Sequence, residues 1–201
     1  MKQLVLNNCL KMINEYNPNM SKKQKDKIMY GIEGLYLTFT KLIIITIVAF
    51  LLGILKEYLI LILAFNGIRL VSFGVHAKKS SHCLISSLLI FIAFPIMCKN
   101  LVIPILYKEI LFLPIVTLIG IFSPSDTQKR PLKRKNRRIV YKVLSIVIAT
   151  FYMTLSLTIK DNTLSNCLIF ALIIQIIIIL PITYKIFGVT YNNYKKYEVN
   201  C

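Results

Sequence analysis

The chain has 201 residues, of which 56% are hydrophobic, and its 25 Lys and Arg residues outnumber 8 Asp and Glu residues to give a net charge of +17. Such a high apolar content argues against an ordinary soluble domain. A strongly basic chain usually meets nucleic acid, an anionic membrane surface or an acidic partner. The long apolar runs decide for the membrane, and no nucleic-acid partner is expected.

Residues 1–30 are predicted to form an amphipathic and basic N-terminal segment. Three apolar side chains fall on one helical stripe, Leu6, Leu10 and Ile13. This helix is suited to lie in the interfacial plane of a membrane, or it is a frayed or packed terminal helix. The basic residues at 21–27 are interpreted as a cluster that orients the chain toward an anionic inner leaflet.

Six apolar segments within residues 31–184 are candidates for spanning helices, which need roughly 20 mainly apolar residues. They are Leu35–Leu55, Tyr58–Ile68, Ser81–Cys98, Leu101–Phe122, Val143–Ile159 and Asn162–Tyr184. The second is short, and the fourth carries Lys108 and Glu109. The predicted fold is an all-α integral membrane protein with six transmembrane helices, in a single membrane domain 1–201 that ends in a tail over residues 185–201.

The charges between the spans test this topology independently, because cytoplasmic loops collect Lys and Arg while translocated loops do not. With six spans, all but four of the 25 Lys and Arg residues fall on one side. The four exceptions are Lys56, Lys99, Lys108 and Lys160. Three of them lie next to an acidic residue, so the other side is nearly neutral. Both termini are therefore predicted to be cytoplasmic.

A polar break between the second and third spans concentrates the chemically useful residues. It holds both histidines of the chain, His76 and His82, together with Cys83 and, at its start, Arg69. A cysteine becomes a nucleophile as the thiolate, whose formation is favoured near a helix N-terminus or beside cationic groups. Cys83 is therefore a candidate nucleophile, and His76 a candidate general base and acid.

This pairing imposes a geometric condition. Residues seven apart on a straight helix differ by roughly 10 Å in height, so His76 and Cys83 can meet only if the chain turns between them. Gly74 and the pair Ser80 and Ser81 favour such a turn, since serine often caps a helix start. We predict a non-helical break here, with Cys83 in the first turn of the third span.

Each of these residues also has a plainer interpretation. Cys83 could be an inert thiol at a span terminus, His82 a solvated loop residue, and Arg69 an anchor that reaches lipid phosphates. The five cysteines show no zinc-ligand spacing and no disulfide framework, so neither a metal nor a cofactor is expected. Cys98 and Cys167 lie near the predicted outer face, either as a disulfide or as buried free thiols.

Two motifs resemble those of the accessory gene regulator protein B family. The first is Arg69-x6-His76-Ala-x5-Cys83, and the second is Pro124-x-Asp126-Thr-x-x-x-Pro131 in the loop after the fourth span. The length, the six-span plan and the basic central loop also agree, so the resemblance covers almost the whole chain. Many family members have Gly-Gly where this chain has Phe73-Gly74.

The resemblance implies a membrane cysteine endopeptidase of quorum sensing and virulence regulation. Such an enzyme removes the C-terminal part of a small autoinducer propeptide and joins the new carboxyl end to an internal Cys or Ser side chain. Cys83 maps to its nucleophile and His76 to the acid/base partner. The family also implies a propeptide with an acidic C-terminal tail, and a homodimer.

Other residues are assigned supporting roles. Arg69, with Gly74, Ser80 and Ser81 around it, is a candidate donor to the oxyanion or to a substrate carboxylate. Asp126 either orients His76 or caps the turn toward Pro131. Five basic residues of the central loop either anchor the topology or dock an acidic propeptide tail, namely Lys129, Arg130, Lys133, Arg134 and Lys135.

Two other classes of function compete with the peptidase. A peptide transporter or exporter usually has broken spans or ionisable groups near the midplane and internal repeats, which the sequence does not clearly show. A non-catalytic membrane scaffold would tolerate loss of the Cys83 thiol.

Overall fold

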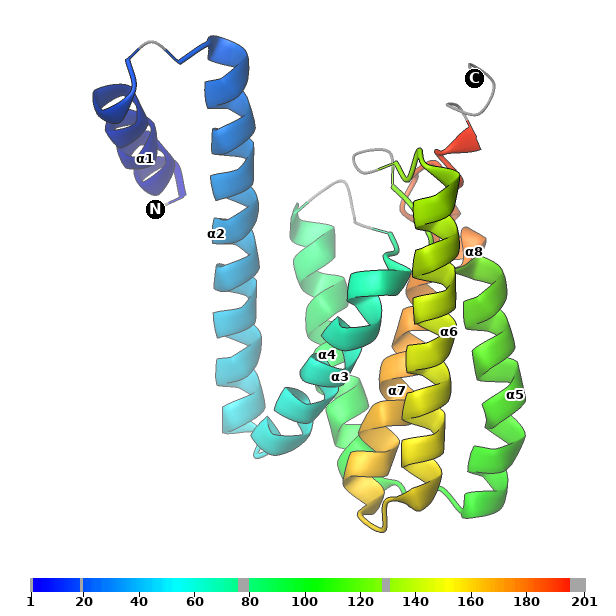
Figure 1. The fold of residues 1–201 in the computed structure, drawn as a ribbon. Helices are drawn as coiled ribbons and strands as arrows, with labels where there is room; N and C mark the ends of the chain where they lie inside the picture. Colours follow the sequence, from blue (N-terminus) through cyan, green and yellow to red (C-terminus); the bar gives the residue numbers. More distant parts are fainter. Residues whose placement is uncertain (1, 19, 76–79, 128–130, 196–201) are drawn as a thin grey trace. The chain divides into compact units, whose positions relative to one another are not determined.

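The computed structural model describes residues 2–18, 20–75, 80–127 and 131–195, with the backbone alone at 80–83. All regular secondary structure in these residues is helical (Figure 1), which confirms the predicted all-α class. The helices are α1 (Lys2–Tyr16), α2 (Lys22–Leu51), α3 (Leu55–Ser72), α4 (Ser80–Asn100), α5 (Ile105–Phe122), α6 (Lys135–Thr158), α7 (Asn162–Ile179) and α8 (Pro181–Ile186).

The chain divides into two compact units, residues 1–47 and 48–201. In the first unit, the predicted N-terminal helix is present as α1, which has no buried residue and exposes apolar side chains such as Leu4 and Met12. Lys2 forms an ion pair with Glu33 of α2. The basic residues at 21–27 belong largely to the start of α2, which extends the first predicted span toward the N-terminus.

Four described helices are long and apolar enough to cross a membrane, namely α2, α5, α6 and α7. They identify the chain as a membrane protein. α3 carries Lys56, Glu57 and Arg69, and the apolar helix from Leu84 to Asn100 within α4 is shorter. The count of six spans therefore stays a prediction.

Helix α7 forms the centre of the second unit. It contacts α3, α4, α5, α6 and α8, and most of its residues are buried. A helix that is apolar all round is stable when neighbours cover every side. The core that packs on α7 draws residues from α3, α5 and α6, namely Ile68, Ile115, Ile119, Ala149 and Met153.

Several predicted span boundaries differ from the observed helices. The first span does not continue to Leu55, because α2 ends at Leu51 and Gly53 follows with φ 66°. Proline explains two further differences. The fourth span begins at Ile105 rather than Leu101, directly after Pro104. The sixth span does not continue to Tyr184, because α7 ends at Ile179 and the short helix α8 starts at Pro181. A proline has no main-chain N–H and fits the first turn of a helix but not its interior.

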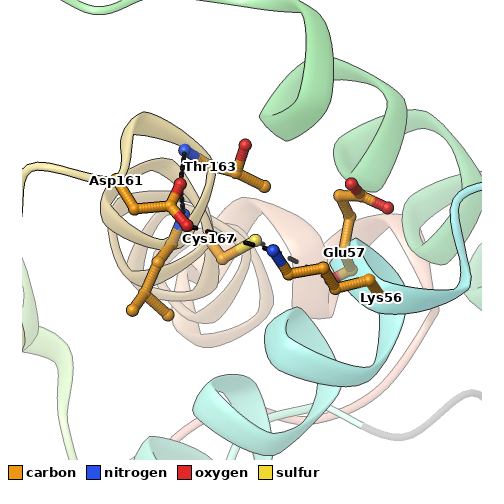
Figure 2. A network of polar contacts seen from close by, with 6 residues as sticks. Lys56, Glu57, Asp161, Thr163 and Cys167 are labelled. Carbon is orange, nitrogen blue, oxygen red and sulfur yellow. Dashed lines mark hydrogen bonds and ion pairs between the residues drawn. The ribbon is translucent and has the colours of Figure 1, made fainter.

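The α2–α3, α4–α5 and α6–α7 connections lie together at one end of the second unit (Figure 1). Polar contacts join them: Lys99 Nζ donates to Gly53 O at 2.9 Å, and Lys56 Nζ lies 4.0 Å from Asp161 Oδ2. Asp161 Oδ1 also accepts from Thr163 N at 2.8 Å and so caps α7, as Figure 2 shows. This is the end that the charge pattern assigns to the nearly neutral side.

The same end contains buried polar groups. Lys108 is 5% exposed, and its Nζ donates to Ser165 Oγ at 2.7 Å. Cys98 and Cys167 are buried free thiols, so the second of their two predicted states is the one present. Cys167 Sγ lies 3.7 Å from Glu57 O (Figure 2). The Lys108–Ser165 bond joins α5 to α7, and the Cys167–Glu57 contact joins α7 to α3. Both lie at the end opposite the two sequence motifs.

Candidate active site

The described residues 73–75 are not helical, so one unbroken helix from Arg69 to Leu89 is excluded, while the predicted turn between His76 and Cys83 falls on residues outside the described ones and stays a prediction. α3 ends at Ser72 and α4 begins at Ser80, so the backbone of Cys83 lies in the first turn of α4. Main-chain N–H groups in a first turn have no partner within the helix. His76 lies outside the described residues, as do the side chains of Ser80, Ser81 and Cys83. The contact between imidazole and thiol therefore stays a prediction.

The chain leaves α3 through two residues with positive φ. Phe73 has φ 59° and ψ −139°, and Gly74 has φ 129°. A Cβ atom at Gly74 would lie 2.6 Å from Cγ2 of Ile178. Both the backbone conformation and the space at this position therefore require glycine.

The positive φ of Phe73 is a conformation that glycine adopts readily and that residues with a Cβ atom adopt rarely. Here two contacts hold the residue in this conformation. Gln175 Nε2, on α7, donates to Phe73 O at 2.7 Å, and the Phe73 ring packs edge-on against Tyr141 with centroids 5.0 Å apart. Tertiary contacts thus stabilise a turn that a phenylalanine would otherwise avoid.

The two sequence motifs pair with each other through their main chains. Ser125 N donates to Ser72 O at 3.0 Å, and Gly74 N donates to Ser125 O at 3.0 Å. These two bonds form an isolated parallel bridge between Phe73 and Ser125. The segment after α5 is therefore a direct support of the turn that leads to His76.

The break between α7 and α8 frees main-chain oxygens. Since Pro181 has no N–H, the carbonyl of Ile177 receives no helical hydrogen bond from it. The hydroxyl of Thr183 donates to that carbonyl instead. The proline thus ends α7 without leaving this carbonyl unpaired.

The main-chain carbonyls of Ile178 and Ile179, which follow Ile177 in α7, accept hydrogen bonds from the two sequence motifs. Ile178 O accepts from Val75 N at 3.2 Å, and Ile179 O accepts from Ser125 Oγ at 3.3 Å. One helix end therefore bonds the residue before His76 and the centre of the second motif. The C-terminal end of a helix also carries partial negative charge.

Arg69 lies in the last turn of α3 and points into this turn. Its Nη2 donates to Val75 O at 3.2 Å, and its guanidinium lies 5.4 Å from the centroid of the Phe65 ring. Arg69 Nη1 is 3.5 Å from where a Cβ on Gly74 would be. The side chain is thus bonded to the residue that precedes His76.

Asp126 is buried, with 2% of its surface exposed. Its Oδ2 accepts from Leu132 N at 3.3 Å, and its Oδ1 accepts from Asn193 N at 2.9 Å. A buried carboxylate is costly unless hydrogen bonds compensate it. The bond to Leu132 joins Asp126 to the residue after Pro131. Because His76 and residues 128–130 lie outside the described residues, the choice between the two predicted roles of Asp126 stays open.

Tyr184 on α8 supports the same segment. Its hydroxyl lies 3.1 Å from both Ser125 O and Asp126 O and donates its proton to this pair of carbonyls. Burial raises the pKa of Tyr184 to about 12. The hydroxyl therefore keeps its proton and remains a donor at neutral pH.

The predicted docking loop is partly described. Lys133, Arg134 and Lys135 are exposed, while Lys129 and Arg130 lie outside the described residues. α6 starts at Lys135 and has no acidic residue in its first turn. Positive side chains at a helix N-terminus are unfavourable in isolation, so this surface is suited to receive negative charge.

Three residues of this arrangement escaped the sequence analysis: Gln175, Tyr184 and Asn193. Gln175 did carry a signal, because it is the one polar residue between 168 and 179. A polar side chain inside an apolar span usually has a partner. Tyr184 and Asn193 carried none, since tyrosine and asparagine are common at membrane boundaries and in tails.

Comparisons with known proteins agree with the resemblance. Residues 6–179 match the family model described as Accessory gene regulator B. A protein of Clostridium acetobutylicum is 32% identical over 172 residues, which cover 86% of this chain and 82% of that protein. A protein of Listeria monocytogenes serotype 4a is 28% identical over 174 residues, covering 86% and 84%. Both are named "Putative AgrB-like protein". No solved structure matches the chain.

Proposed function

The chain belongs to the accessory gene regulator B family, and we propose that it is a membrane-embedded cysteine endopeptidase. The family is associated with the processing of autoinducer propeptides. The proposed substrate is a small quorum-sensing propeptide with an acidic C-terminal tail. The proposed products are that tail and a peptide closed into a thiolactone or lactone ring.

The first chemical step is attack by the Cys83 thiolate on the scissile carbonyl. A C–S bond forms, the C–N bond breaks, and the His76 imidazolium gives its proton to the departing amine. The C-terminal fragment leaves, and the rest of the propeptide remains as a thioester on Cys83.

In the second step, an internal Cys or Ser side chain of the peptide attacks this thioester. Its proton passes to His76, the new ester or thioester closes the ring, and Cys83 leaves as the thiolate that began the cycle. With a substrate cysteine, one thioester replaces another, so the exchange is close to thermoneutral. The acyl-enzyme must be kept from water, which a site at the membrane boundary favours.

The break between α3 and α4 is the observation that carries this proposal. The motif residues Arg69 and Gly74 lie at its start, and Cys83 lies in the first turn of the helix that follows. The second motif, which matches the same family, bonds directly to this break through Ser125. The end of α7 also bonds this break, through Gln175 to Phe73 O and through Ile178 O to Val75 N. A linker without a function would not need these contacts.

Arg69 is proposed to position the turn and to face the developing oxyanion or a substrate carboxylate. Its bond to Val75 O, one residue before His76, supports the positioning role. The main-chain N–H groups at the start of α4 are further candidate donors to the oxyanion.

The proposed topology has six spans, with both termini and the active site at the cytoplasmic boundary. α3 and α4 would supply the two spans beyond the four that length and composition identify. The charge pattern supports this assignment. A homodimer is expected from the family.

The test uses purified chain in liposomes with a candidate propeptide, and mass spectrometry of the released fragment. Cys83→Ala should abolish cleavage, and His76→Ala should slow it by about a hundredfold or more. Cys9→Ala, which removes a thiol in α1, is the matched control and should process normally. A peptide adduct trapped on Cys83 would identify the acyl-enzyme.

The result also separates the competing classes. Full cleavage by Cys83→Ala would show that Cys83 is not the nucleophile and would overturn the cysteine endopeptidase proposal. Absence of cleavage by the wild-type chain as well would favour a scaffold. A chain that moves intact propeptide across the liposome membrane without cutting it would instead be a transporter.

A further inference from the structure

The chain after α8 turns back toward the two motifs. Gly188, with φ 61°, allows the reversal, and Val189 N donates to Tyr184 O at 2.9 Å. The side chains of Thr190 and Asn193 bond each other, and Asn193 Nδ2 donates to Thr190 O at 2.7 Å. These bonds form a turn from Thr190 to Asn193, which leaves the main-chain N–H of Asn193 directed at the second motif.

That N–H meets the carboxylate of Asp126. Asn193 is 2% exposed, and its N lies 2.9 Å from Asp126 Oδ1. Without this bond, the buried carboxylate would keep only its bond from Leu132 N among the described donors. A buried carboxylate that loses a hydrogen bond is destabilised, because the oxygen left without a donor cannot reach water.

Two aromatic contacts fix the segment in place. The Tyr191 ring packs edge-on against Tyr184, with centroids 5.1 Å apart. The Tyr194 ring lies 3.8 Å from the guanidinium of Arg138 on α6. Such contacts contribute to stability beyond the buried area, so residues 188–194 form an ordered part of the site.

A continuous path of hydrogen bonds runs from this segment to the first motif. Tyr184 and Asn193 hold Asp126 and Ser125, and Ser125 pairs with Gly74. The next residue, Val75, immediately precedes His76. The second motif is therefore connected through hydrogen bonds to the residue that precedes the proposed acid/base residue.

We propose that Tyr184 and the main-chain N–H of Asn193 are positioning groups for the proposed peptidase. Their hydrogen bonds hold the second motif against residues 73–75. In the proposal, this contact fixes the position of the His76 imidazole relative to the Cys83 thiol. The inference rests on the proposed function. It extends the site beyond residue 179, where the match to the family model ends.

Three chains test this proposal in liposomes. Tyr184→Phe removes the hydroxyl and keeps the ring against Tyr191. A chain ending at Gly188 removes Asn193 and both aromatic contacts. A chain ending at Lys195 is the matched control, because it retains every contact described above.

Two quantities are measured: kcat for propeptide cleavage, and the pH dependence of Cys83 alkylation by iodoacetamide, followed at Cys83 by mass spectrometry. Tyr184→Phe and the chain ending at Gly188 should lower kcat by about tenfold or more, since small misplacements of reacting groups are costly. Their alkylation midpoints should move toward about 8.5, the value of a free thiol. Because the thiol of an unfolded chain would show the same midpoint, alkylation is compared only for variants whose thermal unfolding in detergent matches that of the wild-type chain.

The outcomes separate this inference from the proposed function. If Cys83→Ala abolishes cleavage but Tyr184→Phe keeps the wild-type rate and alkylation midpoint, the positioning role is wrong and the proposed peptidase activity is retained. If Cys83→Ala cleaves normally, both fail. Should the chain ending at Gly188 not accumulate, Tyr184→Phe decides the question, because its ring still fills the same space.

Discussion

At Gly74, backbone conformation and packing impose the same requirement. Its φ of 129° is rarely adopted by a residue with a Cβ atom, and the space that this atom would occupy is already filled by Ile178. The glycine also donates its N–H to Ser125 O. A single atom added here would therefore disturb both the turn and its pairing with the second motif.

We expect Gly74→Ala to lower stability by about 1–3 kcal/mol and to reduce cleavage more than stability alone explains. Thermal unfolding in detergent and the cleavage rate in liposomes measure the two effects. Gly31→Ala is the matched control, because nothing lies within 4 Å of the added atom in α2. If the two variants had equal stability and activity, a Cβ atom at residue 74 would be tolerated, which would contradict the requirement for glycine.

The sequence predicted those site residues that form short-range patterns. Arg69, Gly74 and Cys83 share one segment, so the residue types in it and their spacing predict a turn and a candidate nucleophile. Gln175 reaches this segment from 102 residues away, and Tyr184 reaches the second motif from 58 and 59 residues away. A contact of that kind leaves no local pattern, and only the packing of α7 and α8 brings it about.

Among the elements, the positions of the helices were well predicted and their ends were not. Apolar runs located α3, α4, α5, α6 and α7, because a membrane requires length and hydropathy above all. Helix ends depend on single residues. Asn162–Tyr184 is free of charge throughout, which concealed the break that Pro181 introduces.

Pro181→Ala tests the importance of this break. The new N–H could bond Ile177 O in place of Thr183 and draw α7 and α8 into one helix. Ile178 O and Ile179 O would then turn away from Val75 N and Ser125 Oγ. We expect stability to change by less than about 1 kcal/mol, while cleavage falls several-fold.

The control for this change is Pro114→Ala, which removes a proline from the interior of α5 without touching the carbonyls at the end of α7. Thermal unfolding and cleavage are measured for both variants. A wild-type cleavage rate in Pro181→Ala would show that the motifs do not depend on this helix end.

For the whole molecule, charge distribution carries the most information. In the predicted six-span topology, the excess of positive residues falls almost entirely on the inner side. Lys56 and Lys99, which that topology assigns to the outer side, have polar partners. Topology requires positive charge on the inner side, but it does not require three consecutive basic residues at 133–135, next to the second motif. This local excess supports a role in docking an acidic tail.

Reversing Lys133, Arg134 and Lys135 to Glu should therefore raise KM for the propeptide by about tenfold at low salt and leave kcat nearly unchanged, because attraction between exposed charges acts on encounter and binding. Added salt should raise KM for the wild-type chain and so reduce the difference in KM between it and the loop variant. Reversal of Lys22, Lys23 and Lys25 in α2 alters the net charge equally and is the control. If both triple variants behave alike, total charge explains the effect; if the loop variant retains a wild-type KM, the loop only anchors the topology.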